Sequence, residues 1–188
     1  MQFLDKRVNV ICNELKKLKV KQSFRIDSWK YKEGNYISPN EAEADDIPWE
    51  EFDCQTMHWY GLDRHYWFKT TYQAPKELDG KRMWMHVKTQ IDEWDDAKNP
   101  QFLLFVNGVA TQGIDMNHRE VLLDTCAKAG EELVLELQAY TGILHKEFNL
   151  IVEMQEIDPD IEKLYYDLWV PLAAFSRMEE DDKNRRDI

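Results

Sequence analysis

Residues 105–121 read Phe-Val-Asn-Gly-Val-Ala-Thr-Gln-Gly-Ile-Asp-Met-Asn-His-Arg-Glu-Val, a tight turn followed by a dense polar loop. The Asn-Gly pair at 107–108 tolerates the positive φ angles of two-residue hairpin turns, so antiparallel strands are predicted on both sides of it. The second half places Asp115, Asn117, His118 and Arg119 in one short loop. So many polar groups together either fix the loop through internal hydrogen bonds or contact something outside it.

Around this stretch the sequence alternates with the two-residue period of β-strands. Between Lys81 and Trp94, for example, Met83, Met85 and Val87 fall on one side and polar residues on the other. Strands are predicted within residues 23–36, 57–74, 81–94, 101–106, 119–123, 132–140 and 145–155, and a solvated acidic loop at 38–46. With nothing helical expected between residues 22 and 157, this pattern predicts a mainly β fold, an antiparallel β-sandwich or jelly roll resembling galactose-binding domains.

Both ends of the chain are predicted to be helical. Residues 3–19 carry one apolar stripe, formed by Leu4, Val8, Ile11, Leu15 and Leu18. A second helix is expected after Asp158-Pro159, and its internal proline at position 171 predicts a kink or break. We therefore expect three parts: an N-terminal helix (1–21), a β-sandwich (22–157), and a C-terminal helix with a charged linker (158–188).

Composition and charge narrow the class of partner. The 188 residues include 24 Lys and Arg against 36 Asp and Glu, a formal net charge of −12. This charge disfavours nucleic acid and anionic membranes, because phosphate binding needs clustered basic side chains. Cys12, Cys54 and Cys126 lack zinc or redox spacing, which is typical of a reducing cytoplasm. Neither a secretory signal nor a membrane span is recognisable, so a cytoplasmic location is predicted.

Four motifs follow one another in an order that resembles a known family. They are Trp59-Tyr-Gly-Leu-Asp-Arg-His-Tyr-Trp-Phe68, the 105–121 stretch, Ala139-Tyr-Thr-Gly142 and Leu164-Tyr-Tyr-Asp-Leu168. Together they resemble the N-terminal, non-catalytic β-sandwich region of α-mannosidases of glycoside hydrolase family 38, in the cytosolic and bacterial branch. The resemblance covers most of residues 1–175. Its more specific element is Asn-His-Arg-Glu-Val at 117–121, whereas many glycosidase sandwiches share the Val-Asn-Gly turn.

The resemblance implies a longer protein whose boundary with the next domain lies in the charged run after Met178. In that family, a catalytic α/β barrel follows, binds one zinc ion and cleaves α-mannosides with retention through an Asp nucleophile. Such a barrel needs about 250 residues, so no catalytic residue, metal or cofactor is expected in this chain. The downstream catalytic domain is the expected partner. A mannose-containing glycan is a second candidate ligand, and a homo-oligomeric parent is compatible with both.

Six residues are candidates for contact with the neighbouring domain or a sugar: Asp115, Asn117, His118, Arg119, Trp59 and Trp67. Tryptophan faces suit the apolar face of a pyranose ring, with Tyr60 and Trp84 as further platform residues. The alternative is structural: a loop held by its own hydrogen bonds, and tryptophans packed inside the sandwich. The pairs Asp115/His118 and Asp63/His65 offer two metal donors each. Because catalytic zinc usually takes three protein ligands, no metal site is assigned.

Three functions are compatible with the sequence. The first is an accessory domain of an α-mannosidase, supported by the order of the motifs. The second is a free-standing carbohydrate-binding module, supported by the aromatic content. The third is a small metal-dependent β enzyme, supported only by the Asp115/His118 pair.

Overall fold

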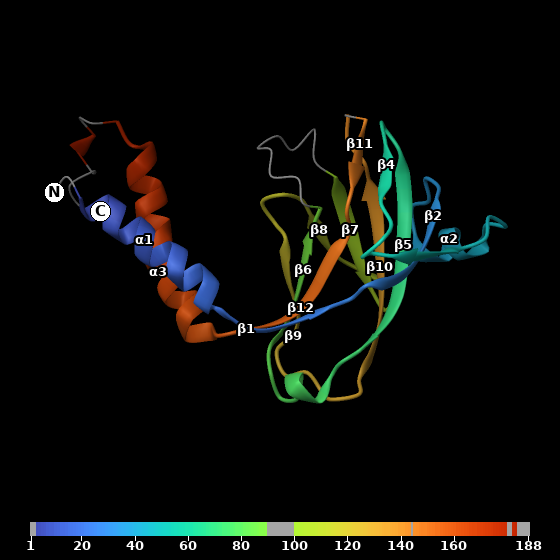
Figure 1. Ribbon diagram of the computed structural model, residues 1–188, viewed down its shortest axis with the longest axis horizontal. Helices are drawn as coiled ribbons and strands as arrows, with labels where there is room; N and C mark the ends of the chain where they lie inside the picture. Colours follow the sequence, from blue (N-terminus) through green and yellow to red (C-terminus); the bar gives the residue numbers. More distant parts are fainter. Residues whose placement is uncertain (1–2, 90–99, 144, 180–181, 184–188) are drawn as a thin grey trace. The chain divides into compact units, whose positions relative to one another are not determined.

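The computed structural model describes residues 3–89, 100–143, 145–179 and 182–183. The chain forms two compact units (Figure 1). Residues Ser23–Gln155 make up the sandwich unit, and Met1–Gln22 together with Glu156–Ile188 make up the helical unit.

The larger sheet of the sandwich unit has six strands in the order β3-β2-β5-β10-β7-β8. Each strand pairs antiparallel with its neighbours in this sheet. The strands are β2 (Ser28–Glu33), β3 (Glu50–Asp53), β5 (His65–Gln73), β7 (Gln101–Val106), β8 (Val109–Ile114) and β10 (Glu132–Tyr140).

The second sheet has four strands in the order β1-β12-β6-β9, and a third, two-stranded sheet joins β11 to β4. These strands are β1 (Val20–Arg25), β4 (Trp59–Gly61), β6 (Met83–Lys88), β9 (Glu120–Asp124), β11 (Lys146–Phe148) and β12 (Ile151–Ile157). A short 3-10 helix, η1 (Lys76–Leu78), precedes β6.

One hydrophobic core joins the two larger sheets face to face. It contains Phe68 and Leu135 from the six-stranded sheet and Met85 and Met154 from the four-stranded sheet, all buried. Strand β6 shows the expected alternation, with every second residue buried. The predicted fold class, an antiparallel β-sandwich with flanking terminal helices, is therefore confirmed. The expected continuation of the 81–94 strand beyond Thr89 falls outside the described residues, as do the acidic pairs at 92–93 and 95–96.

The outer face of the six-stranded sheet carries a second, smaller core that the sequence did not predict. Trp67 and Phe105 point away from the main core and pack with Tyr36 and with Ala42 of helix α2 (Pro39–Ala44). The acidic stretch 38–46 was predicted to be a loop, and that prediction was wrong. Ser38 caps the helix by accepting a hydrogen bond from the backbone N–H of Glu41, with proline at the first helical position.

The Asn-Gly turn joins β7 to β8, as predicted. Asn107 and Gly108 both have positive φ angles, 50° and 76°. Asn107 also fixes the turn to its neighbour, because its side-chain oxygen accepts from the N–H of Val134 at 2.9 Å and its own N–H donates to the carbonyl of Val134 at 2.8 Å. The predicted strand at 132–140 has the expected bounds, whereas the single strand expected at 145–155 is divided into β11 and β12.

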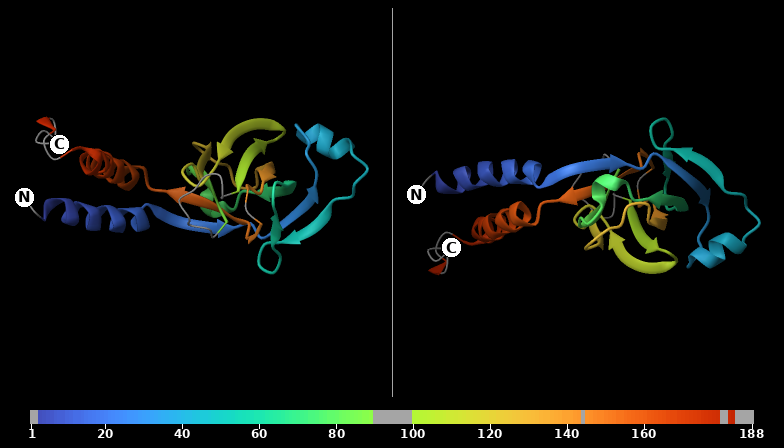
Figure 2. Two further views of the ribbon diagram at one scale, coloured as in Figure 1. Left: turned by 90° about the horizontal axis from the view of Figure 1, so that it is seen from above. Right: turned by 90° about the horizontal axis from the view of Figure 1, so that it is seen from below.

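The helical unit contains α1 (Leu4–Leu18) and α3 (Pro159–Arg177). The two helices contact each other: they cross in the view of Figure 1 and lie side by side in both views of Figure 2. The carboxylate of Asp158 caps α3, as predicted, by accepting from the N–H groups of Asp160 and Ile161. Helix α3 runs on past Pro171 to Arg177, so the alternative of a break at the proline was wrong. Among the described residues, no helix is both long and apolar enough to cross a membrane.

Candidate functional site

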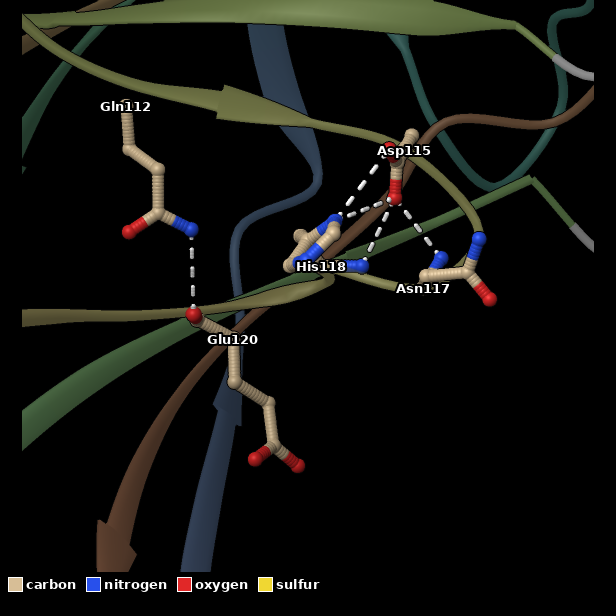
Figure 3. A network of polar contacts seen from close by, with 5 residues as sticks. All are labelled: Gln112, Asp115, Asn117, His118 and Glu120. Atoms are coloured by element: carbon tan, nitrogen blue, oxygen red, sulfur yellow. Dashed lines mark hydrogen bonds and ion pairs between the residues drawn. The ribbon is translucent and has the colours of Figure 1, made fainter. Parts of the chain in front are cut away.

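The polar loop at residues 115–119 carries the chain from one layer of the sandwich to the other. Strand β8, which ends at the buried Ile114, belongs to the six-stranded sheet, and β9, which begins at Glu120, belongs to the four-stranded sheet. The side chain of Gln112 donates to the carbonyl oxygen of Glu120 at 3.3 Å and so joins the two strands (Figure 3). The carbonyl of Arg119 accepts from the N–H of Val87 at 2.9 Å. Both ends of the loop are thus held by the sheets.

Asp115 organises the loop from within. Its Oδ1 atom accepts from the backbone N–H groups of Asn117 and His118, each at 2.8 Å, and lies 3.0 Å from Nδ1 of His118 (Figure 3). Partial burial on its own would raise the pKa of Asp115, but the two backbone hydrogen bonds and the His118 ring outweigh it and lower the pKa. Asp115 is therefore a carboxylate at neutral pH, and the expectation that it caps backbone amides is confirmed.

The carboxylate of Asp115 sets the orientation of His118. Because Asp115 can only accept, the neutral imidazole carries its proton on Nδ1 and leaves Nε2 as an acceptor. The His118 side chain is 70% exposed, so this nitrogen is accessible to a partner. A carboxylate that orients an exposed imidazole in this way prepares it for hydrogen bonding, for proton transfer or for metal ligation.

The geometry gives little support for proton transfer or metal ligation by His118. The described part of the chain contains no group of three or more His, Cys, Asp and Glu side chains that could hold a metal ion. The second pair of metal donors predicted from the sequence is Asp63 and His65. Tyr140 lies between them, because its hydroxyl donates to Asp63 at 2.9 Å and its ring lies 5.1 Å from that of His65. A zinc site of the usual three-ligand kind does not fit the residues at either pair. The cavity behind the loop, beside Arg119 and Phe102, is no larger than a water molecule.

Two of the predicted contact residues are inside the protein. Trp59 is 1% exposed and packs against four aromatic rings of the main core, and Trp67 is 0% exposed beneath α2. Neither ring can stack on a sugar or touch another domain, so this prediction was wrong for both. The missed signal is the continuous apolar run of Tyr66, Trp67 and Phe68, which is typical of a strand covered on both faces.

Three loops emerge from the same end of the six-stranded sheet. Strand pairing places Tyr140 opposite both His65 and Gln101, and Phe102 opposite Ile114. Three loops therefore lie at the same end of the strands: 62–64, 115–119 and 141–143. We call the surface that they form the loop face. At about 4.8 Å between neighbouring strands, the distance from β5 to β8 is about 14 Å.

The loop face has features that were missed from the sequence. Leu62 and Ile143 are large apolar residues that are exposed there beside Tyr60, which the sequence had already offered as a platform residue. Asp63 has a φ angle of 54°, which is rare for a residue other than glycine. It is held in place by the hydroxyl of Tyr140 and by its own N–H, which donates to the carbonyl of Gly142 at 2.9 Å. In the sequence, the glycines at 61 and 142 could have indicated two adjoining turns with an unusual backbone conformation.

No protein-family model matches the chain, and no curated protein matches it. The chain is similar in structure to a β-glucuronidase from Ruminococcus gnavus in complex with D-glucaro-d-lactam, with a TM-score of 0.48 and 12% identity over 75% of this chain and 30% of that one. A β-glucuronidase from an uncultured Clostridium gives 0.48 and 11%, over 74% and 30%. The β-glucuronidase of Faecalibacterium prausnitzii gives 0.44 and 10%, over 73% and 32%. The chain spans about a third of the length of these enzymes.

Proposed function

We propose that this chain is an accessory, non-catalytic β-sandwich region of a glycoside hydrolase, and more narrowly of a cytoplasmic α-mannosidase similar to those of family 38. The observation that carries the proposal is the convergence of motifs. Residues 59–68, 105–121 and 139–142 are far apart in the sequence, yet each contributes a loop to the loop face. Because the three motifs share one location, we infer that they share one role, which is contact with something outside the sandwich.

The expected partner at the loop face is the catalytic domain of the same polypeptide. The exposed apolar side chains of Tyr60, Leu62 and Ile143 lie beside polar loops, the usual composition of a contact between domains. The Asp115 carboxylate already holds His118 in place, so little side-chain freedom is lost when a partner binds. His118 would then offer Nε2 to a hydrogen-bond donor of the catalytic domain or to a sugar hydroxyl at the edge of its cleft.

Zinc and the catalytic residues are proposed to belong to that catalytic domain. A barrel of the required kind needs about 250 residues, more than the 188 residues of this chain. The cytoplasmic location rests on the thiols: Cys12, Cys54 and Cys126 are all free. Burial raises the pKa of the Cys54 thiol to about 12, which suits an unreactive core residue rather than a nucleophile.

The test compares the chain with the longer polypeptide on a panel of aryl glycosides. We expect the isolated chain to release no aglycone from an aryl α-mannoside, and the longer polypeptide to release it in a zinc-dependent way. In that longer protein, His118→Ala should reduce kcat/KM or the thermal midpoint, while an exposed residue outside the loop face, Val109→Ala, should change neither. Hydrolysis by the isolated chain would contradict the accessory role, and activity restricted to another glycoside would contradict the α-mannosidase assignment.

A carbohydrate-binding module is the second candidate, favoured by the exposed ring of Tyr60 on the loop face. Titration calorimetry with mannose and mannobiose distinguishes the two. Binding heat at millimolar sugar that is lost in Tyr60→Ala would support the module. Absence of heat in the wild-type chain would remove it.

A further inference from the structure

Residues 34–49 cross the outer face of the six-stranded sheet between β2 and β3, and we call them the strap. They include α2, which lies on the side of this sheet away from β6 and β12 (Figure 1). Most of the strap is exposed, and its only buried residues are Tyr36, Pro39 and Ala42. Helix α2 has 6 residues, too few to be stable by itself. The strap is therefore held in place by its contacts with the sheet.

The ammonium group of Lys32 contacts the strap at both of its ends. The Lys32 side chain projects from β2, and the residue is 3% exposed. Its Nζ atom lies 5.0 Å from the ring centres of both Tyr36 and Trp49, and it donates to the carbonyl of Ile47 at 3.3 Å. Tyr36 belongs to the start of the strap, and the other two partners belong to its end. Lys32 therefore joins both ends of the strap to the sheet.

Burying this ammonium group makes the closed strap less stable. Among the residues that the structure describes, no carboxylate pairs with Lys32, whose partners are two rings and one carbonyl. An ammonium group that leaves water loses its hydration, and cation–π contacts with a single hydrogen bond recover only part of it. All of these partners belong to the strap, so opening the strap returns Lys32 to water. The closed state therefore lacks hydration free energy that the open state regains.

Two buried indole groups disfavour the closed strap in the same way. The Nε1 atoms of Trp49 and Trp67 are buried and have no acceptor among the described residues. Trp67 lies opposite Lys32 in the pairing of β2 with β5, and Trp49 is the last residue of the strap. A buried N–H without an acceptor has lost its hydrogen bond to water and gained none in return. Opening the strap lets water reach both groups.

Few contacts hold the strap closed. The ion pair between Lys69 and Glu43, at 2.5 Å, is 31% and 45% exposed, and exposed pairs contribute little to stability. The side chain of Gln138 donates to the carbonyl of Tyr36 at 2.6 Å. The apolar contribution comes from the smaller core, to which the strap supplies Tyr36 and Ala42 as buried residues. The closed and open states are therefore closer in free energy than the folded and unfolded sandwich.

We propose that the strap opens as a unit while both sheets stay folded, and that the buried charge of Lys32 keeps it poised to open. The main core contains no residue of the strap, so its packing does not require the strap to be closed. Opening uncovers the rings of Trp67 and Phe105, whose centres are 5.5 Å apart, beside the ammonium group of Lys32. The inference is independent of the function proposed above, because it rests on the strap and the sheet beneath it.

Hydrogen exchange followed by NMR tests the local opening in the full chain. In α2 the N–H of Ala42 donates to the carbonyl of Ser38 at 3.1 Å, whereas β10 is paired on both sides. After correction for intrinsic rates, we expect the α2 amides to exchange about 100-fold faster than the β10 amides, or more. Low urea concentrations should change the α2 rates little, because local opening exposes little surface. Rates and urea dependence equal to those of β10 would overturn the proposal.

The role of Lys32 is tested with a neutral side chain of similar length. Lys32→Met removes the buried charge and keeps most of the volume, so it should slow exchange of the α2 amides by about tenfold or more. The β10 amides should slow by the same factor, because Lys32 is in water in both the open and the unfolded states. Lys30→Met is the matched control, since Lys30 is an exposed lysine on the same face of β2. It should change neither rate.

A variant of the main core separates local from global opening, even if Lys32→Met does not fold. Leu135 is fully buried in that core, so Leu135→Ala should accelerate exchange in β10 and leave the α2 amides unchanged. Acceleration of both would mean that the strap opens only when the sandwich unfolds, which contradicts the proposal. Faster α2 exchange in Lys32→Met would show that the ammonium group clamps the strap shut, and would overturn the proposal, as would equal effects of the Lys30 and Lys32 variants.

Discussion

The sandwich unit and the helical unit have equally regular apolar patterns but use them differently. In β10, the alternating residues Leu133, Leu135 and Leu137 are all buried between the sheets. In α1, the seven-residue series of Leu4, Ile11 and Leu18 is exposed. Periodicity thus predicts that a face will be covered, but it does not say whether the same chain supplies the cover.

Replacing the same residue type in the two units should show this contrast most strongly. Leu135→Ala leaves a cavity in the core, where Leu135 is fully buried, and should lower the free energy of unfolding by about 2–5 kcal/mol. Leu164→Ala removes an exposed side chain of α3 and should cost less than about 1 kcal/mol. Urea unfolding of each variant against wild type measures both. Similar costs would show that α3 is covered within the single chain.

In the helical unit, a substitution at Pro171 should raise stability rather than lower it. It lies inside α3, where it lacks an N–H donor and its ring crowds the preceding turn. Pro171→Ala should therefore stabilise α3 locally, by about 1–3 kcal/mol. Hydrogen exchange of the α3 amides should slow accordingly. Unchanged or faster exchange would mean that the proline is needed for the path of the helix.

The turn of the β7–β8 hairpin offers a smaller effect within the sandwich unit. Gly108 has a φ angle of 76°, and the space beside it is open, so Gly108→Ala should cost about 1–2 kcal/mol through backbone strain alone. Gly113 is also in open space but has no positive φ angle, which makes Gly113→Ala the matched control with little or no cost. Thermal unfolding of both variants tests the assignment. Equal costs would point away from turn geometry.

Local rules explain what the sequence predicted well. The Asn107-Gly108 turn, the strand at 132–140 and the Asp158 cap depend on residues close together in the chain. The polar loop was partly predictable for the same reason, since Asp115 bonds to amides two and three residues away. Such contacts form wherever the segment is placed.

The wrong predictions concern residues that are covered by elements far away in the sequence. Trp67 was expected to be a contact residue. The apolar run in its strand indicates a cover on both faces, but not that α2 supplies the outer one. The α2 signal itself was present: Ser38, Pro39 and Glu41 are a cap, a first-turn proline and a reciprocal carboxylate, and Glu41 accepts from the N–H of Ile37 at 2.7 Å. The loop face likewise depends on strand register, since it joins residues 63 and 140.

The pH dependence of the polar loop gives the smallest expected effect. Asp115→Ala removes the acceptor of two backbone N–H groups and should cost about 1 kcal/mol at pH 7. His118→Ala keeps both of those bonds and should cost less. Denaturant unfolding of wild type and both variants measures the differences.

The sign of the pH effect follows from the lowered pKa of Asp115. The folded state holds this carboxyl below its usual value of 3.8, so its charged form contributes stability above that pH. As pH falls through the folded pKa, the carboxyl is protonated in both states and that contribution is lost. The difference between wild type and Asp115→Ala should therefore shrink in acid, while that for Leu135→Ala should not. A difference that persists well below pH 3.8 would mean that Asp115 holds the loop by its shape rather than its charge.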